Sequence, residues 1–315
     1  MGSIPVGVTI FIGDTPVFEK ISKAGVLLTK KIGDKMTIKD VIKIQVRKLK
    51  LNSIENPFNI CRIIIANSMN VNKEYIIAHD NYEINTNILE EINININKII
   101  NGYPLQYITH KQEFMKLNFY INEDVLIPQP DTEILVQEVL KICNKKENNK
   151  LKILDLCTGS GAIAVSIAKN YKNAIITATD ISKKAIEVAK INANIQQVNI
   201  KFKESNMFEK INDRYDIIVS NPPYIEIDKI KNLAKDVQHE PLIALSGGID
   251  GLKFYRIIAE NSYKYINNKG FLALEIGYNQ KNEVTKILQE TNKYNEIYYI
   301  KDYNNIDRVI IAKIK

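Results

Sequence analysis

The chain has 315 residues, which is too long for one small core and predicts about two domains, since domains of roughly 150 residues are common. Hydrophobic residues make up 45% and charged residues 25% of the sequence, as in ordinary globular proteins. The net charge of +7 permits an anionic partner. The lysines form no long basic block, so we interpret them as charges of a solvated surface.

The cysteines and the apolar segments exclude several further classes of protein. Cys61, Cys143 and Cys157 lie far apart, without the spacing of a metal site or a disulfide framework, so we expect no metal and a reducing compartment. No segment approaches the ~20 apolar residues of a membrane span. The apolar segment at residues 4–12 lacks the preceding basic residues of a signal peptide. We therefore expect a cytoplasmic monomer that binds no membrane and forms no stable complex with nucleic acid.

The first 35 residues differ from the rest of the chain. They carry glycines among β-branched residues, which predicts short strands and turns. The pattern changes at Met36, which we interpret as an alternative natural start of the chain. We therefore interpret residues 1–35 as an extension of unknown role, a misassigned start or a tag. The glycines in question are Gly2, Gly7, Gly13, Gly25 and Gly33.

Residues 36–104 are predicted to form a smaller, helical N-terminal domain. Thr37 is suited to cap a helix, and the apolar residues that follow recur at helical spacing. The alternation of Ile and Asn over residues 92–97 fits either a helix or a strand. Gly102 and Pro104 are expected to end the domain.

A hairpin connector is predicted over residues 105–130, where apolar residues alternate around Phe114 and Phe119. A helix then opens at Asp131 or Thr132. After Lys150 the predicted strands alternate with helices, which favours a mostly parallel, doubly wound α/β sheet over residues 131–315. Strands are expected at residues 151–156, 174–179, 215–220 and 270–276, and helices at residues 162–169 and 182–194.

A glycine-rich turn follows the first of these strands and opens a helix. Glycine lets the backbone approach a ligand closely, and a helix N-terminus supplies unpaired N–H groups. Asp180, at the end of the next strand, can accept hydrogen bonds from both hydroxyls of a ribose. Together they favour a nucleoside ligand over a bare turn and a capping aspartate, but NAD and S-adenosylmethionine both stay open. The turn reads Asp155-Leu156-Cys157-Thr158-Gly159-Ser160-Gly161-Ala162.

The choice between these ligands rests on Asn221-Pro222-Pro223-Tyr224, which follows the strand at residues 215–220. Ligands of doubly wound sheets lie outside the carboxyl ends of the strands, so this segment should face the glycine turn. An amide NH₂ offers two donors, which the Asn221 side-chain oxygen and the Pro222 carbonyl can accept. The prolines stiffen the segment, and Tyr224 offers a π face to a positive sulfonium or a planar substrate. This pattern predicts methyl transfer to a planar nitrogen by positioning.

The sequence closely resembles the release factor glutamine methyltransferases, the HemK/PrmC family, over most of residues 102–308. Asn-Pro-Pro-Tyr also suits adenine methyltransferases, but Ile-Pro-x-Pro-Asp-Thr-Glu is much more specific to the glutamine enzymes. The residues that carry the resemblance are Pro104-Leu105-Gln106-Tyr107-Ile108, Glu113-Phe114, Leu126-Ile127-Pro128-Gln129-Pro130-Asp131-Thr132-Glu133, the glycine turn, Asp180, Asn221-Pro222-Pro223-Tyr224-Ile225, Glu240-Pro241, Ala244-Leu245, Gly248-Ile249-Asp250-Gly251-Leu252 and Leu274-Glu275-Ile276-Gly277.

This resemblance implies a Rossmann-like class I methyltransferase that uses S-adenosyl-L-methionine and releases S-adenosyl-L-homocysteine. It implies that the substrate is the glutamine in the Gly-Gly-Gln loop of a peptide chain release factor, which the helical domain helps to recognise. The implied catalytic residues are Asn221, Pro222 and Tyr224, and Pro223 joins them in binding the substrate. The implied cofactor contacts are Cys157, Thr158, Gly159, Ser160 and Gly161 for the methionine part, Asp180 for the ribose, Asn206 and Met207 for the adenine, and Asn221.

Two departures from the family pattern and two histidines bear on the site. Gln129 stands where the family usually has Arg, so any ion pair made there is expected to be lost. Met207 stands where an aromatic residue is frequent, so adenine stacking is expected to be weaker. We interpret His110 and His239 as structural, because the proton of the target amide can leave to solvent after transfer. For Glu133 and Glu240 the sequence supports two roles equally well: they line the crevice, or they form ordinary salt bridges or helix caps.

Four other functions are weighed on sequence grounds. A ribosomal-protein glutamine methyltransferase differs only in its partner. An adenine-N6 methyltransferase acting on nucleic acid would suit the positive charge, but it needs to flip its base and usually carries a target-recognition region that is not seen here. A non-enzymatic binding protein is disfavoured by the intact Asp180 and Asn221, and an NAD enzyme lacks a recognisable hydride-transfer constellation.

Overall fold

The computed structural model describes residues 10–12, 15–17, 36–146 and 150–315. Near the amino terminus, β1 (Ile10–Ile12) pairs antiparallel with β2 (Thr15–Val17). This pair agrees with the short strands predicted there. The glycines on which that prediction rested lie outside the described residues. The role of residues 1–35 therefore stays an open prediction.

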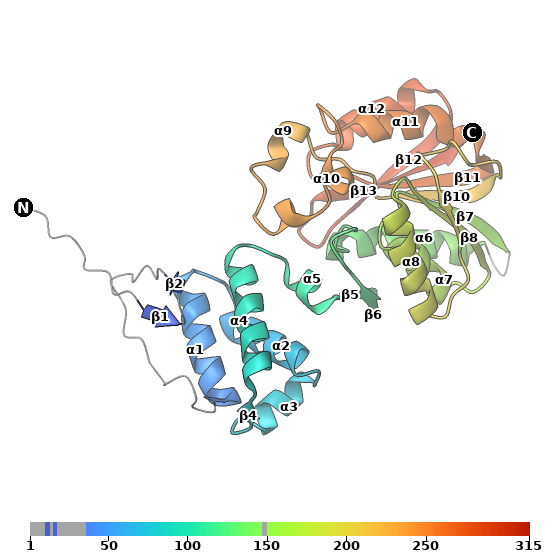
Figure 1. Cartoon of the computed structure of the whole chain (residues 1–315). Helices are drawn as coiled ribbons and strands as arrows, with labels where there is room; N and C mark the ends of the chain where they lie inside the picture. Colours follow the sequence, from blue (N-terminus) through green and yellow to red (C-terminus); the bar gives the residue numbers. More distant parts are fainter. Residues whose placement is uncertain (1–9, 13–14, 18–35, 147–149) are drawn as a thin grey trace, which may run out of the picture.

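A helical bundle follows (Figure 1). It has its own hydrophobic core. Thr37 caps the first helix as predicted, because its hydroxyl accepts from the Asp40 N–H while the Asp40 carboxylate accepts from the Thr37 N–H. Ile38, Leu49, Ile64 and Ile96 are fully buried in this core. The bundle consists of α1 (Ile38–Leu51), α2 (Pro57–Ser68), α3 (Lys73–Ala78) and α4 (Thr86–Ile100), with the two-residue strands β3 (Met36–Thr37) and β4 (Glu83–Ile84) paired beside them.

The segment of alternating Ile and Asn lies inside α4 and is therefore a helix. A strand would place Ile92, Ile94 and Ile96 on one face. Instead Ile92 and Ile96 are fully buried while Ile94 is 57% exposed. The buried positions recur four residues apart, which is the spacing of one helix face. Packing against α1 and α2 thus decides between the two readings.

The connector contains the predicted hairpin and also a helix that was not predicted. The short helix α5 (Leu105–Thr109) precedes β5 (Lys111–Phe114) and β6 (Leu117–Tyr120), which pair antiparallel. Phe114 and Phe119 are buried in the same core as the helices of the sheet domain. The hairpin therefore packs as part of the larger domain, while α5 contacts α2 of the bundle.

The larger domain is built on a sheet that, in the described part of the chain, has seven strands in the order β12-β13-β11-β10-β7-β8-β9. The strands from β11 to β9 are parallel, and β13 lies antiparallel between β11 and β12. This arrangement confirms the predicted doubly wound, mostly parallel sheet. The strands are β7 (Leu151–Leu156), β8 (Ala174–Asp180), β9 (Lys201–Glu204), β10 (Tyr215–Ser220), β11 (Ile266–Glu275), β12 (Tyr294–Lys301) and β13 (Asp307–Ile314).

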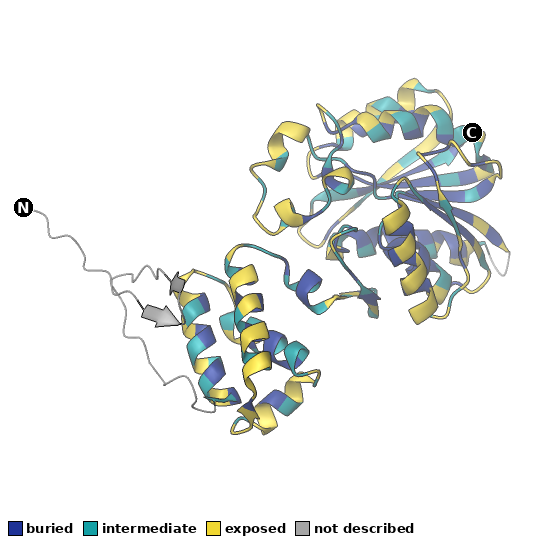
Figure 2. Cartoon of the chain, viewed as in Figure 1, coloured by how far each residue is buried: buried dark blue, intermediate teal, exposed yellow. Residues whose placement is uncertain are grey.

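Helices cover both faces of the sheet (Figure 2). Neighbouring residues of a strand point to opposite faces. Ile153 packs against α6, α7 and α8, whereas Leu154 packs against α11 and α12. The first helix starts at Pro130, one residue before the predicted start, because proline suits the first turn. The helices are α6 (Pro130–Lys145), α7 (Ala162–Asn170), α8 (Lys183–Ile195), α9 (Ile227–Ile230), η1 (Val237–His239), α10 (Leu242–Leu245), α11 (Lys253–Asn261), η2 (Ser262–Lys264) and α12 (Lys281–Glu290).

In the ranges that the structure describes, no helix has both the length and the apolar character needed to cross a membrane. The predicted domain limits of 36–104, 105–130 and 131–315 stay predictions.

Candidate functional site

The carboxyl ends of β7, β8 and β10 meet at one edge of the sheet, where the strand order reverses between β7 and β10. A cavity of about 330 Å³ opens at this edge. Seven of the residues predicted to bind cofactor or substrate line it: Cys157, Gly159, Asp180, Asn206, Met207, Asn221 and Pro223. Segments that are far apart in the sequence thus supply one site.

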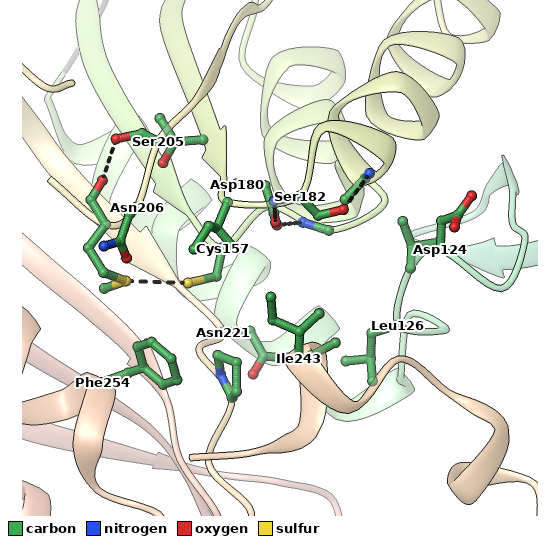
Figure 3. A pocket seen from close by; sticks show the side chains of 18 of the residues that line it. Asp124, Leu126, Cys157, Asp180, Ser182, Ser205, Asn206, Asn221, Ile243 and Phe254 are labelled. Carbon is green, nitrogen blue, oxygen red and sulfur yellow. Dashed lines mark hydrogen bonds between the residues drawn. The ribbon is translucent and has the colours of Figure 1, made fainter. Parts of the chain in front are cut away.

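Other lining residues were not singled out from the sequence. In Figure 3, Phe254 lies on one side of Cys157, and Asp124 lies on the other. Leu126 and Ile243 also line the cavity, and Ile243 is 54% exposed. Asp124 and Leu126 come from the connector, whereas Ile243 lies in α10 and Phe254 lies in the first turn of α11. Apolar residues at a loop or at a helix start carry no chemical signature, so the sequence offered no signal for them.

Five predicted site residues do not line the cavity: Thr158, Ser160, Gly161, Pro222 and Tyr224. Thr158 is buried, and its hydroxyl donates to Asp155 Oδ2 at 2.6 Å. Gly161 caps α7 in the left-handed conformation, with φ +80°. In this structure, therefore, Thr158 and Gly161 shape the turn around the cavity, and the contacts predicted for all five residues stay predictions.

Gly159 leaves room for a ligand at the centre of the turn. Its φ is +53°, and a Cβ built on it would meet nothing within 4 Å. Gly161 differs, because its Cβ would come within 3.0 Å of the Ala189 side chain on α8. Glycine is therefore required at residue 161 by packing, whereas at residue 159 the space beside the backbone belongs to the cavity.

The Asp180 carboxylate is held in place by the backbone. Oδ2 accepts from the Gly159 N–H at 2.9 Å, and Oδ1 accepts from the Ser182 N–H at 2.9 Å (Figure 3). Burial raises the pKa of Asp180, and the N–H groups of Ser182, Gly159 and Ile181 oppose that rise. Each oxygen keeps a further lone pair, so the group can still accept from hydroxyls in the cavity.

Cys157 and Met207 form a sulfur-lined wall of the cavity. The thiol of Cys157 donates to Met207 Sδ at 3.8 Å (Figure 3). Both residues have positive φ, +59° and +46°. Burial raises the pKa of the Cys157 thiol, so it stays protonated and acts as a packed side chain, in line with the sequence interpretation. Next to them, Asn206 Nδ2 donates to Glu209 Oε1 at 2.6 Å.

Asn221 lies at the cavity with one end of its amide already occupied. Its Nδ2 donates to the Thr132 hydroxyl at 3.2 Å. Because the amide nitrogen faces α6, the amide oxygen remains as the acceptor that this side chain can present to a ligand. Thr132 lies 89 residues earlier in the chain, and this contact was not anticipated from the sequence.

The backbone after Asn221 is clamped from two sides. Gln280 Nε2 donates to the Tyr224 carbonyl at 3.0 Å, and Gln280 Oε1 accepts from the Gly277 N–H. A Cβ on Gly251 would lie 2.4 Å from the Tyr224 carbonyl, so only glycine permits this approach. The side chain of Tyr224 packs against the core on the α11 and α12 face. Asn221 and the two prolines therefore rest on a rigid support.

Several acidic and imidazole groups near the site have structural partners. Glu240 Oε2 accepts from the Ile127 N–H at 2.8 Å, and Glu133 Oε1 accepts from the Met115 N–H at 2.7 Å. His110 stacks on Tyr120, and His239 meets the ring of Tyr103 edge-on. Neither the two glutamates nor the two histidines line the cavity.

Gln129, which departs from the family pattern, caps its own turn. Its Nε2 donates to the Ile127 carbonyl at 3.1 Å. Nearby, Arg308 contacts Asp131 at 3.0 Å and Asp302 at 3.1 Å. The start of α6 therefore carries an ion pair that does not involve residue 129.

Comparisons with known proteins cover both parts of the chain. Residues 130–245 match the methyltransferase small domain, and residues 40–109 match the PrmC N-terminal domain. The release factor glutamine methyltransferase of Clostridium acetobutylicum is 41% identical over 284 residues, which cover 88% of this chain and 98% of that protein. The enzyme of the same name from Fusobacterium nucleatum is 39% identical over 283 residues, covering 87% of this chain and 78% of that protein.

Solved structures agree on the fold. The hMettl16 catalytic domain aligns with a TM-score of 0.51 at 15% identity, covering 62% of this chain and 74% of that chain. At this identity the likeness shows the methyltransferase fold alone. The sequence matches, by contrast, extend through the helical bundle and the sheet domain at about 40% identity. The chain therefore belongs to the release factor glutamine methyltransferase family.

Proposed function

We propose that this protein transfers a methyl group from S-adenosylmethionine to the side-chain amide nitrogen of the glutamine in the Gly-Gly-Gln loop of a release factor. The observation that carries the proposal is the arrangement of Asn221. Its amide nitrogen is engaged by Thr132, and its oxygen is left to accept from an NH₂ group in the cavity. The family to which the chain belongs supplies the identity of that NH₂ group.

The residues around the turn fit a nucleoside cofactor. The Asp180 carboxylate is oriented by two backbone N–H groups, which leaves it able to accept from ribose hydroxyls. The open space beside Gly159 accommodates the methionine part, and Asn206 and Met207 line the wall proposed for the adenine. When bound, S-adenosylmethionine supplies a methyl group activated by its positive sulfonium.

The proposed role of the protein groups is to position the amide. Its nitrogen is a weak nucleophile, since its lone pair is delocalised into the carbonyl. Two acceptors, the Asn221 oxygen and the Pro222 carbonyl, can hold the two N–H groups at a fixed angle. Aiming the nitrogen in this way lowers the entropic part of the barrier. The extra proton leaves to solvent after transfer, so no side chain needs to act as a base first.

Mass spectrometry of a release factor from the same organism tests this proposal. After incubation with the protein and S-adenosylmethionine, we expect one added methyl on the glutamine of the Gly-Gly-Gln peptide. Asn221→Ala should abolish the product, while Asn232→Ala, at an exposed asparagine outside the cavity, should leave it unchanged.

The opposite results are equally informative. Full activity of Asn221→Ala would remove the basis for the proposed substrate site. An unmodified release factor, despite S-adenosylmethionine binding measured by calorimetry, would contradict the proposed substrate. The same assay would then be applied to ribosomal proteins and to adenine in nucleic acid.

A further inference from the structure

Behind Asn221, on the side away from the cavity, lies a group of buried polar side chains from separate elements. Thr132 is in the first turn of α6 and is 4% exposed. Glu275 is the last residue of β11 and is 2% exposed. Neither residue lines the cavity. A buried carboxyl group and a buried hydroxyl are costly unless they are hydrogen-bonded, so their placement beside Asn221 needs a reason.

The three polar side chains contact one another. Asn221 Nδ2 donates to Thr132 Oγ1 at 3.2 Å. Thr132 and Asn221 lie next to the Glu275 carboxyl group, and their donor groups oppose the burial that raises its pKa. Its Oε2 has no hydrogen-bond partner of its own among the described residues. The carboxyl group therefore keeps an oxygen that can accept from a neighbouring donor.

These contacts specify which end of the Asn221 amide faces inward. An ionised carboxylate only accepts, so Thr132 gives its single hydrogen to Glu275 and accepts from Asn221 with a lone pair. The two ends of an asparagine amide have nearly the same shape, so hydrogen-bond partners alone select the orientation. Turned by 180°, Asn221 would place its oxygen against the Glu275 carboxylate and its NH₂ in the cavity.

Charged and polar groups from several segments surround Glu275. Burial raises the pKa of Glu275 to about 7 and Asp131 adds to that rise, whereas Arg308 opposes it. Tyr224 lies near the Glu275 carboxyl group, and Tyr255 donates to the Glu275 main-chain carbonyl at 3.0 Å. Asp302 pairs with the same Arg308. Arg308 is therefore the cation that stabilises the Glu275 carboxylate once it ionises, and Glu275 acts purely as an acceptor above about pH 7.

We infer that Glu275 and Thr132 are positioning residues that hold the Asn221 amide with its oxygen toward the cavity and its NH₂ toward the protein interior. They act through Asn221 and do not touch the substrate. The catalytic consequence rests on the proposed function, because the orientation matters for the reaction only when the substrate presents an NH₂ group. With the amide turned around, two NH₂ groups would face each other and the substrate would lose an acceptor.

The test compares variants of the full chain in steady-state kinetics with a release factor. Thr132→Val removes the hydroxyl at nearly constant shape, and Glu275→Gln lets residue 275 donate as well as accept. We expect both to lower kcat by about tenfold, the loss expected for one misplaced hydrogen bond. The Kd for S-adenosylmethionine should stay the same. Thr132→Ser, which keeps the hydroxyl, should restore kcat.

Thr177→Val is the matched control. Thr177 is 5% exposed on β8 and lies outside the cavity lining, so the substitution removes a comparably buried hydroxyl elsewhere in the sheet. It should leave kcat unchanged even if it lowers the melting temperature. Wild-type kcat in Thr132→Val and Glu275→Gln would overturn the inference. The inference would also be overturned if Thr132→Ser lowered kcat, cofactor affinity and melting temperature as much as Thr132→Val does. That result would indicate a purely structural role.

A second measurement does not depend on activity. In NMR spectra of the full chain with ¹⁵N-labelled asparagine, the side-chain NH₂ of Asn221, assigned by its absence in Asn221→Ala, should be protected from hydrogen exchange. Thr132→Val and Glu275→Gln should remove that protection. A rapidly exchanging NH₂ in the wild-type protein would overturn the inference whether or not the release factor is the substrate. An inactive wild-type enzyme with a protected NH₂ would contradict only the proposed function.

Discussion

At the scale of single residues, Asp180 shows how a local arrangement prepares a binding group. Its two oxygens accept from the N–H groups of Gly159 and Ser182, so the carboxylate cannot rotate away from the cavity. Burial disfavours the charge, while the N–H groups stabilise it. A carboxylate fixed in this way can bind hydroxyls without a further loss of side-chain entropy.

Asp180→Asn is expected to weaken S-adenosylmethionine binding by roughly 10- to 100-fold, since a hydrogen bond to a charged group contributes about 1.5–3 kcal/mol. The new NH₂ would also face the Gly159 or the Ser182 N–H. Isothermal titration calorimetry measures the change. Asp213→Asn, an exposed aspartate outside the cavity, removes the same charge and should bind normally. Equal affinities of the two variants would contradict the role proposed for Asp180.

At the scale of elements, the turn between β7 and α7 requires its two glycines for different reasons. Gly161 has φ +80° and packs against Ala189 of α8, so a side chain there meets both backbone strain and a close contact. Gly159 has φ +53° but open space beside it. Gly161 therefore lets α7 pack closely against α8, whereas Gly159 leaves space for a ligand in the cavity.

Gly161→Ala should lower the free energy of unfolding by about 1–3 kcal/mol, the range for a strained residue in the left-handed region. Gly159→Ala should cost less stability, but should weaken cofactor binding more than its stability loss implies, because the methyl group enters the cavity. Urea unfolding and calorimetry on both variants separate the two effects. The reverse order of stabilities would show that the contact with Ala189 is easily relaxed.

At the scale of the whole molecule, buried carboxyl groups make the stability depend on pH. Burial raises the pKa of Asp155, Glu240 and Glu275 to about 7. Their ordinary values are 3.8, 4.5 and 4.5. The folded protein therefore retains protons that the unfolded chain releases. The stability that this difference contributes is present below the ordinary pKa and is lost as the pH rises toward about 7.

Glu240→Gln is expected to remove the part of this pH dependence that comes from Glu240. Glutamine keeps the acceptor for the Ile127 N–H but carries no proton to lose. Relative to the wild type, the variant should become more stable as the pH rises from about 4.5 to about 7, by on the order of 1 kcal/mol per unit of pKa difference. Urea titrations across that window measure the difference. A constant or falling difference would show that the pKa of Glu240 is close to its ordinary value.

The sequence by itself determined the type of fold and the composition of the candidate site to a large extent. The alternation of strands and helices around Gly159, Asp180 and Asn221 predicted the parallel sheet, and parallel strands bring their carboxyl ends to one edge. The cap at Thr37 was also readable, because capping depends on residues only three positions apart. These features depend on residues close together in the sequence or on the order of strands and helices. They could therefore be predicted from the sequence without a structure.

Only the tertiary structure decided the features that depend on distant partners. Ile94 is exposed and Ile96 buried because helices pack around α4, which no alternation of Ile and Asn can specify. The amide orientation of Asn221 depends on Thr132, 89 residues away, and on Glu275 at the end of β11. Such contacts arise when strands and helices from separate segments close over a shared core, so their geometry is a property of the assembled sheet.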